Sequence, residues 1–132
     1  EGTCPLSDIR ANTISDAAGT GPIDLYKQSA AKAWANYDTT GTTEFRDSFN
    51  FSSLTDNNTG DTTLNVTNSF SNGNYTVAMM GGRAGATGSF FARYNDNLTV
   101  PTASSFRVQL IDYNGNGTDG DRITMSCHGD LA

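Results

Sequence analysis

The stretch Phe106-Arg-Val-Gln-Leu110 has the clearest pattern in this 132-residue chain, because apolar and polar residues alternate along it without interruption. A period of two places the apolar side chains on one face of a β-strand and the polar side chains on the other. The same period recurs downstream at Ile123, Met125 and Cys127. We therefore expect strands that each have one buried and one solvated face.

Similar short patterns precede this stretch, with clusters of Gly, Asn, Asp or Ser between them, at residues 32–37, 44–51, 63–67, 75–79 and 90–94. In the second pattern, Phe45, Phe49 and Phe51 all occupy odd positions, so alternation predicts that their rings point inward. We also expect Trp34 to fill the core. Strands at such short intervals indicate an all-β fold, a jelly-roll-like antiparallel β-sandwich over residues 31–132.

Residues 1–30 differ from the rest of the chain in composition. Large apolar residues are few there, and Ala17-Ala-Gly-Thr-Gly-Pro22 is a cluster that interrupts regular structure. Such a segment is too polar to pack a core of its own. We expect an extended N-terminal arm that leads into the sandwich domain and crosses onto a neighbouring chain.

Composition and charge exclude several partners. Asp and Glu number 14 against 8 for Lys and Arg, and the net charge of -6 disfavours nucleic acid and anionic lipid as partners. No apolar run approaches the roughly 18 residues of a membrane span. Thr, Gly, Asn and Ser together supply 57 of the 132 residues, which favours strands and turns over long helices.

The sequence does not indicate an enzyme. His128 is the only histidine, and its neighbour Cys127 would point to the opposite face of a strand, so the two cannot act together. Most aspartates stand in turn clusters with Asn or Gly. We therefore expect no catalytic residues.

The segment from Asp112 to Asp121 has two interpretations. It matches the first half of a calcium-loop pattern, with oxygen ligands at alternating positions before a glycine. The candidate ligands are Asp112, Asn114, Asn116, Asp119 and Asp121. However, Ile123 stands at the twelfth position, where a calcium loop has Glu, so we favour a polar hairpin loop and expect no cofactor.

Two further pairs of residues are candidates for structural or binding roles. Cys4 and Cys127 lie near opposite ends of the chain and form either a disulfide or two free thiols. Tyr94 and Tyr113 lie near turns or strand ends, where rings either stack on a sugar or partner or cover the rim of the core. They are our candidate receptor-binding residues.

The chain resembles a bacteriophage module found in tail-fibre and related virion proteins, notably of marine and cyanobacterial phages. The matching segments are Lys32-Ala-Trp34, Asp47-Ser-Phe-Asn50, Ser52-Ser-Leu-Thr-Asp56 and Thr59-Gly-Asp61. The similarity covers residues 14–80 well and the rest loosely. The ending Cys127-His-Gly-Asp-Leu-Ala132 departs from the module's pattern.

The resemblance implies a homotrimeric, β-rich component of the virion, an extracellular particle. Its partners would be other virion proteins and a glycan or protein on the host surface, and no catalytic residues come with it. We expect a tail fibre or similar appendage that faces the host. The alternatives are a capsid decoration or head-fibre protein, and a secreted adhesin or carbohydrate-binding module.

Overall fold

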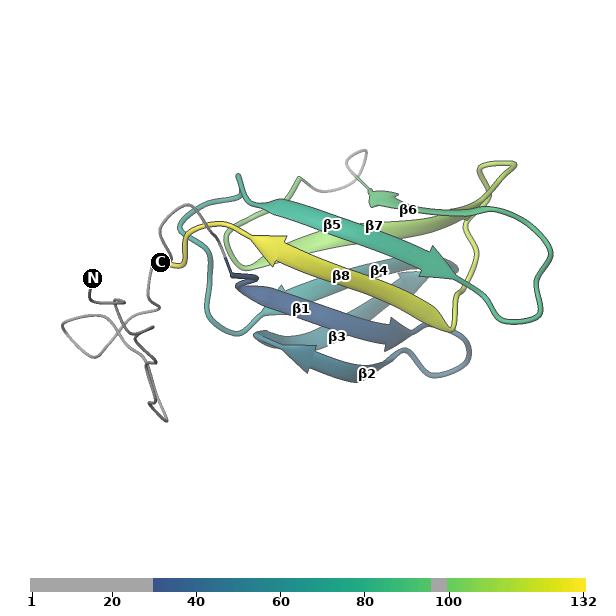
Figure 1. Ribbon diagram of the computed structural model, residues 1–132, viewed down its shortest axis with the longest axis horizontal. Coiled ribbons are helices and arrows are strands. Elements are labelled where there is room, and N and C mark those ends of the chain that lie inside the picture. Colours follow the sequence, from purple (N-terminus) through teal and green to yellow (C-terminus); the bar gives the residue numbers. More distant parts are fainter. Residues whose placement is uncertain (1–29, 96–99) are drawn as a thin grey trace, which may run out of the picture.

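The computed structural model describes residues 30–95 and 100–132, and in these ranges it contains eight strands and no helix (Figure 1). All pairings between the strands are antiparallel. The strands are β1 (Ala33–Asp38), β2 (Glu44–Phe49), β3 (Phe51–Asn58), β4 (Asp61–Val66), β5 (Thr76–Gly82), β6 (Phe90–Tyr94), β7 (Ser105–Asp112) and β8 (Arg122–His128). The predicted all-β antiparallel fold is confirmed.

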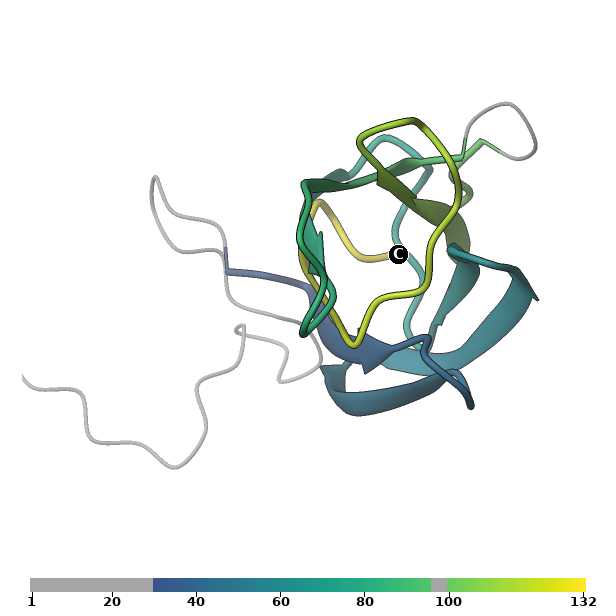
Figure 2. The same ribbon diagram turned by 90° about the vertical axis from the view of Figure 1, so that its right-hand side faces the viewer.

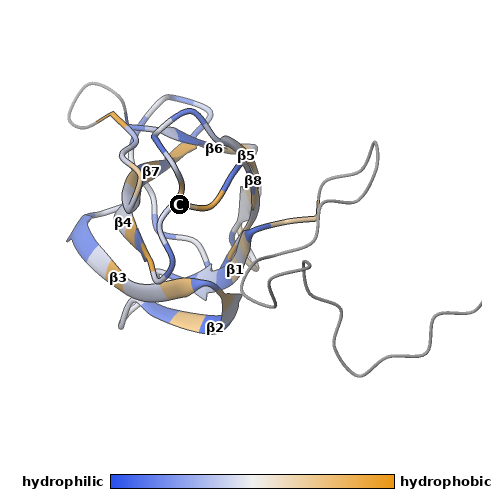
Figure 3. Cartoon of the chain, turned by 90° about the vertical axis from the view of Figure 1, so that its left-hand side faces the viewer, coloured by the Kyte–Doolittle hydropathy of each residue, from blue (hydrophilic) through white to orange (hydrophobic). Residues whose placement is uncertain are grey.

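The strands form two four-stranded sheets. The first sheet has the order β2-β1-β8-β5, and the second sheet has the order β3-β4-β7-β6. End-on views show the two sheets facing each other around a common interior (Figures 2 and 3). Apolar and polar residues alternate along the strands, as expected when each sheet buries one face in a sandwich.

The link between β7 and β8 differs from the prediction. We expected a hairpin over this segment, but β7 belongs to the second sheet and β8 to the first, so the chain crosses between the sheets there. Alternation reports which face of a strand is buried and carries no information about which sheet the strand joins. The β6–β7 hairpin is therefore nested in sequence between β5 and β8, which pair with each other, a jelly-roll-like feature.

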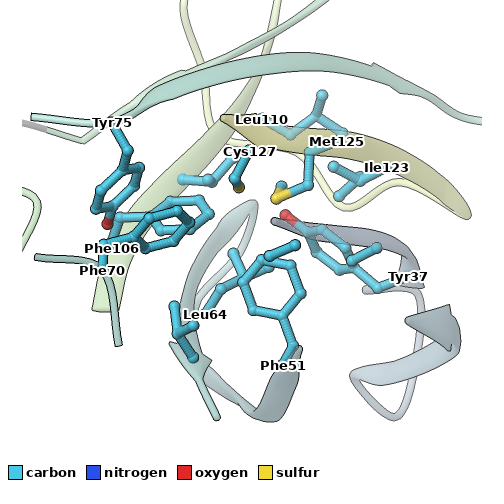
Figure 4. Packing of buried hydrophobic residues seen from close by; sticks show 14 residues of the cluster. Tyr37, Phe51, Leu64, Phe70, Tyr75, Phe106, Leu110, Ile123, Met125 and Cys127 are labelled. Atoms are coloured by element: carbon cyan, nitrogen blue, oxygen red, sulfur yellow. The ribbon is translucent and has the colours of Figure 1, made fainter. Parts of the chain in front are cut away.

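Aromatic rings dominate the interior, and Phe106 is at their centre (Figure 4). Its ring centroid lies 6.0 Å from that of Phe51, 5.8 Å from Tyr75 and 6.2 Å from Tyr94, each in an edge-on arrangement. Edge-on pairs at such distances contribute about 0.5–1.5 kcal/mol each beyond their buried area. Aliphatic and sulfur side chains of both sheets complete the core: Leu64, Leu110, Ile123, Met125 and Cys127.

The chain turns from the first sheet into the second at Asn50. This residue has a left-handed backbone, with φ of 61°, which Asn tolerates better than most residues. Its side-chain Oδ1 accepts the backbone N–H of Asn68 at 2.8 Å, and its Nδ2 donates to the carbonyl of Lys32 at 3.0 Å. Asn50 thereby ties the beginning of β1 to the segment that follows β4.

The three phenylalanines around this corner do not share a face. The register between β1 and β2 shifts at Arg46, which is an extra residue in its strand, a β-bulge. The bulge reverses which alternate residues face inward. Phe45 therefore packs on Phe51, with ring centroids 6.1 Å apart, whereas Phe49 is 53% exposed on the outer face. The inward prediction is wrong for Phe49.

Trp34 also lies on the outer face, so our expectation that it fills the core is wrong. It is 39% exposed and pairs with Phe49 across the β1–β2 ladder. Its neighbours Ala33 and Ala35 are buried, and strand alternation then directs the indole outward. The small inward alanines leave the interior to rings from other segments.

Two further expectations concern the N-terminal arm and membrane-spanning segments. The predicted N-terminal arm lies outside the described residues, apart from Ala30 at its end. In the described ranges, no helix has the length and hydropathy needed to cross a membrane.

We predict that Asn50→Gly loses about 2 kcal/mol of unfolding free energy, because the backbone keeps its conformation while the side-chain hydrogen bonds disappear. Asn50→Ala is expected to lose about 1 kcal/mol more, because a Cβ makes a left-handed backbone costly. Urea unfolding of both variants measures the two losses. Losses below roughly 0.5 kcal/mol, the size of a neutral surface change, would contradict this role.

Candidate functional site

The connections between strands gather at the two ends of the sandwich. The described chain enters β1 and finishes after β8 at one end, which we call the terminal end (Figure 1). There Ser71 N–H donates to the carbonyl of Asp130, and Ala132 N–H donates to that of Ser69, each within 2.9 Å. The opposite end, which we call the loop end, carries the segments 39–43, 59–60, 83–89 and 113–121.

Aspartates fasten the segments of the loop end to one another. Asp119 accepts the backbone N–H of Gly60 at 2.7 Å, and Asp121 accepts that of Ala84, also at 2.7 Å. A carboxylate that accepts a backbone N–H forms a charge-assisted hydrogen bond, which is stronger than a neutral one. The loop end is therefore a connected surface rather than a set of independent loops.

Gly60 lies where two segments approach most closely. Its φ is 68°, and a Cβ at this position would lie 2.4 Å from the backbone nitrogen of Thr118. Its carbonyl accepts the N–H of Leu110 at 2.7 Å, which joins the β3–β4 turn to the end of β7. Only glycine fits this position, for reasons of both backbone conformation and space.

The five calcium-loop candidates do not form a cluster of carboxylates. Asp112 Oδ1 accepts the backbone N–H groups of Asn114 and Asn116, both at 2.9 Å, as in an Asx turn. Asp119 and Asp121 bind backbone groups of two other segments, as described above. In residues 30–95 and 100–132, no three His, Cys, Asp or Glu side chains are placed to hold a metal ion.

The two candidate receptor-binding tyrosines lie far apart in the fold. Tyr113 is 71% exposed on the loop end, directly after β7. Tyr94 lies at the other end of the β6–β7 ladder, opposite Val108, and its ring packs edge-on against Phe106. Tyr94 therefore covers the rim of the core, and Tyr113 is the one that a partner can reach directly.

An ion pair between a buried aspartate and a half-buried arginine of the second sheet was not apparent from the sequence. Arg107 binds Asp61 through two nitrogens, at 2.6 and 2.8 Å, and Asn95 donates to the same carboxylate at 2.8 Å. The bond to Asp61 raises the pKa of Arg107. Because Asp61 follows Gly60 directly, this pair fixes the β3–β4 turn from the side of the sheet.

Cys127 lies in the middle of the core and is 0% exposed, as a free thiol. Burial raises its pKa to about 12. Cys4, the other half of the disulfide alternative, lies outside the described residues, so the choice between a disulfide and two free thiols is not tested by the structure.

We predict a pH effect on stability through Asp112. The N–H and side chain of Asn116, with the N–H groups of Asn114 and Gly115, lower the pKa of its carboxyl group in the folded state. A lowered pKa stabilises the fold above the unfolded value of about 3.9, and the contribution is lost as the pH falls through the folded value. The melting temperature should therefore fall less between neutral and acidic pH in Asp112→Asn than in the natural chain; parallel curves would contradict this.

We predict that Cys127 does not react in the folded protein. In a Cys4→Ser variant at pH 8, Ellman's reagent should detect no thiol until guanidinium chloride unfolds the chain, after which it should detect one. The reasons are burial and a very small thiolate fraction. Reaction of the folded variant would contradict the burial of Cys127. A separate measurement, the thiol count of the natural chain unfolded without reducing agent, tests the Cys4–Cys127 bridge.

Comparison with known proteins adds no family to this description. No protein-family model, curated protein or solved structure matches the chain. A function is therefore inferred from the geometry of the two ends and the faces of the sandwich, together with the phage-like segments of the sequence.

Proposed function

We propose that this chain is a non-enzymatic structural component of a bacteriophage virion, a homotrimeric tail-fibre or similar appendage module that faces the host. The observation that carries the proposal is the separation of the two ends. The described chain enters and finishes at the terminal end, while the fastened segments lie at the loop end. A module held through its terminal end presents the loop end outward.

The phage-like segments coincide with residues on which this fold depends. Asp47-Ser-Phe-Asn50 ends at the corner between the sheets. Thr59-Gly-Asp61 contains the glycine that no other residue can replace and the buried carboxylate that binds Arg107. This supports the resemblance, because a shared fold would need the same residue types at a tight corner and a tight turn.

The loop end has the chemistry of a recognition surface. It presents the exposed ring of Tyr113, the amides of Asn114 and Asn116, and a hollow of about 210 Å³. The hollow is lined by Gly82, Arg83, Ala84, Asp121 and Arg122. Exposed rings beside amides and charged groups suit sugars or polar protein surfaces, and several copies on one particle would strengthen weak contacts.

The same surface also favours one alternative from another class, a secreted adhesin or carbohydrate-binding module. Within the virion, the alternative is a capsid decoration or head-fibre protein. The position of the protein on phage particles separates the three. An appendage module lies at the tail or its fibres, a decoration protein lies on the head, and an adhesin is absent from both.

The decisive experiment images intact particles of the phage that encodes this chain, with gold-labelled antibody against it. We expect gold at the tail or its fibres. Gold over the head would replace the proposal with the decoration protein, and particles without gold would overturn any virion role.

We predict that Tyr113→Ser weakens binding of the fluorescent protein to host cells by about tenfold, the size of effect expected for one interfacial aromatic residue. Val100→Ser is the matched control, because Val100 is also exposed but lies toward the terminal end. Equal binding by the two variants would show that the loop end is not the recognition surface.

A further inference from the structure

The outer face of the first sheet is unusual for a sandwich exposed to water. One row across its four strands consists of Phe49, Trp34, Ser126 and Ala78, in that order. The next row consists of Asp47, Asn36, Thr124 and Met80. Phe49, Trp34 and Met80 are 53%, 39% and 71% exposed. Large apolar side chains thus occupy positions where an isolated sheet has polar ones.

The outer face of the second sheet provides the comparison within the same molecule. Its side chains bond to one another: Asn57 donates to Thr63 at 2.9 Å, Asn65 to Ser53 at 3.0 Å, and Arg93 to Gln109 at 2.8 Å. Apart from Phe91 and its cross-strand partner Ile111 near one edge, this face is polar. Three of the exposed large apolar side chains lie on the outer face of the first sheet and one on that of the second, which points to a covering partner on the first sheet.

The side chains of the row with Phe49 and Trp34 differ in size from one side of the sheet to the other. Two large rings, which we call the aromatic pair (Trp34 and Phe49), stand on β1 and β2. Ala78 and Ser126 stand on β5 and β8, where together with Met80 and Thr124 they border a shallow hollow of about 260 Å³. One face thus carries both a projection and a recess, as is required if the face is to pack against the same face of another copy.

The charged residues of the first sheet are also divided unequally between β1 and β2 on one side and β5 and β8 on the other. Strands β1 and β2 contain Asp38, Glu44 and Asp47 against Arg46, whereas β5 and β8 contain Arg122 and no acidic residue. Placing the aromatic pair of one copy on the hollow of another would therefore bring the acidic strand pair beside a strand pair whose only Lys or Arg residue is Arg122, which lies 4.0 Å from Asp121. Opposite charges across a contact favour this orientation over the reverse.

We propose that the partner of this face is a second copy of the chain, whose aromatic pair seats in the hollow formed by Ala78, Met80, Thr124 and Ser126. Because the aromatic pair and the hollow lie side by side on one face, two copies face to face would fill both hollows at once, whereas a ring needs each copy to give its pair to one neighbour and its hollow to another. The inference deepens the proposed function, since it names the surface through which a homotrimeric appendage would assemble.

The dimensions of the sheet set the strength to expect. Four strands about 4.8 Å apart and six residues long give a footprint of roughly 400 Å² per face. In a ring each contact uses about half of this face, well below the roughly 800 Å² that each partner buries in a stable complex, so one contact alone is weak and ring closure is needed for a lasting assembly. Association should accordingly depend steeply on protein concentration.

The single tryptophan makes the contact directly observable. Trp34 is the only tryptophan of the chain, so its fluorescence reports on the aromatic pair alone. As concentration rises from about 1 to 100 µM, a range suited to a weak contact, we expect its emission to shift to shorter wavelength. Over the same range, sedimentation should show a multiple of the 14.0 kDa chain.

Three variants test the two halves of the contact. Trp34→Thr combined with Phe49→Thr removes the aromatic pair, and Ala78→Lys fills the hollow; each should sediment as a monomer at all these concentrations. Thr55→Lys is the matched control, because Thr55 is also exposed but lies on β3 of the second sheet, and it should assemble like the natural chain. Circular dichroism and thermal melting verify that all three fold.

Mixing the two interface variants gives the sharpest test. The Ala78→Lys chain keeps its aromatic pair, and the double variant keeps an open hollow, so an equal mixture should form one-to-one pairs and no larger ring. The emission of Trp34, now present in one variant only, should shift on mixing as it does in the natural chain.

Several results would overturn the inference: variants that assemble like the natural chain, a mixture that stays monomeric, or a natural chain that is monomeric throughout. A monomer with short-wavelength emission would mean that residues of the same chain cover the face, and a monomer whose emission shifts with oligosaccharides would mean a glycan platform. Failure here is separate from failure of the proposed function, because gold labelling locates the protein on particles regardless of how its copies touch.

Discussion

The rest of the structure depends on the left-handed corner at Asn50. The chain has to leave the first sheet and enter the second within one residue, and Asn50 does this with a φ of 61° and hydrogen bonds to the beginning of β1 and to Asn68. With the bulge at Arg46, the corner decides that Phe51 turns into the core and Phe49 turns away from it. An interior built around Phe106 and an exterior that carries the aromatic pair are thus two results of one local constraint.

The three functional surfaces inferred for this molecule do not compete for space. The terminal end lies opposite the loop end, and the face with the aromatic pair runs alongside both. Attachment, assembly and recognition would therefore use different residues. The loop end keeps its shape through Asp119, Asp121 and the ion pair of Asp61 with Arg107, so recognition residues such as Tyr113 stand on a surface that is already ordered.

The sequence predicted the elements well and their placement less well. Period-two alternation located residues 106–110 within β7 and residues 123–127 within β8, because half-buried strands produce that signal directly. It failed at Phe49, since a bulge adds one residue without changing the composition of the strand. It also failed for the link after Asp112, because nothing in a strand's own pattern states which sheet it joins.

The candidate site was harder to predict for a related reason. Asp112, Asp119 and Asp121 follow a spacing that suits a cation, yet the same spacing suits turns, and only the fold shows that each carboxylate binds the backbone of a different segment. Trp34 could have been read correctly from its neighbours. Ala33, Ala35 and Tyr37 form an inward series that leaves the indole outside.

The position of β1 has a mechanical consequence. Strand β1 is the first the described chain enters, and it is hydrogen-bonded on both sides, to β2 and to β8. Tension between the terminal end and a partner held at the loop end would run along the strands, while the ladder bonds lie across them. The bonds on both sides of β1 would then share the load in shear and yield together, rather than opening one after another as in a peeled edge strand.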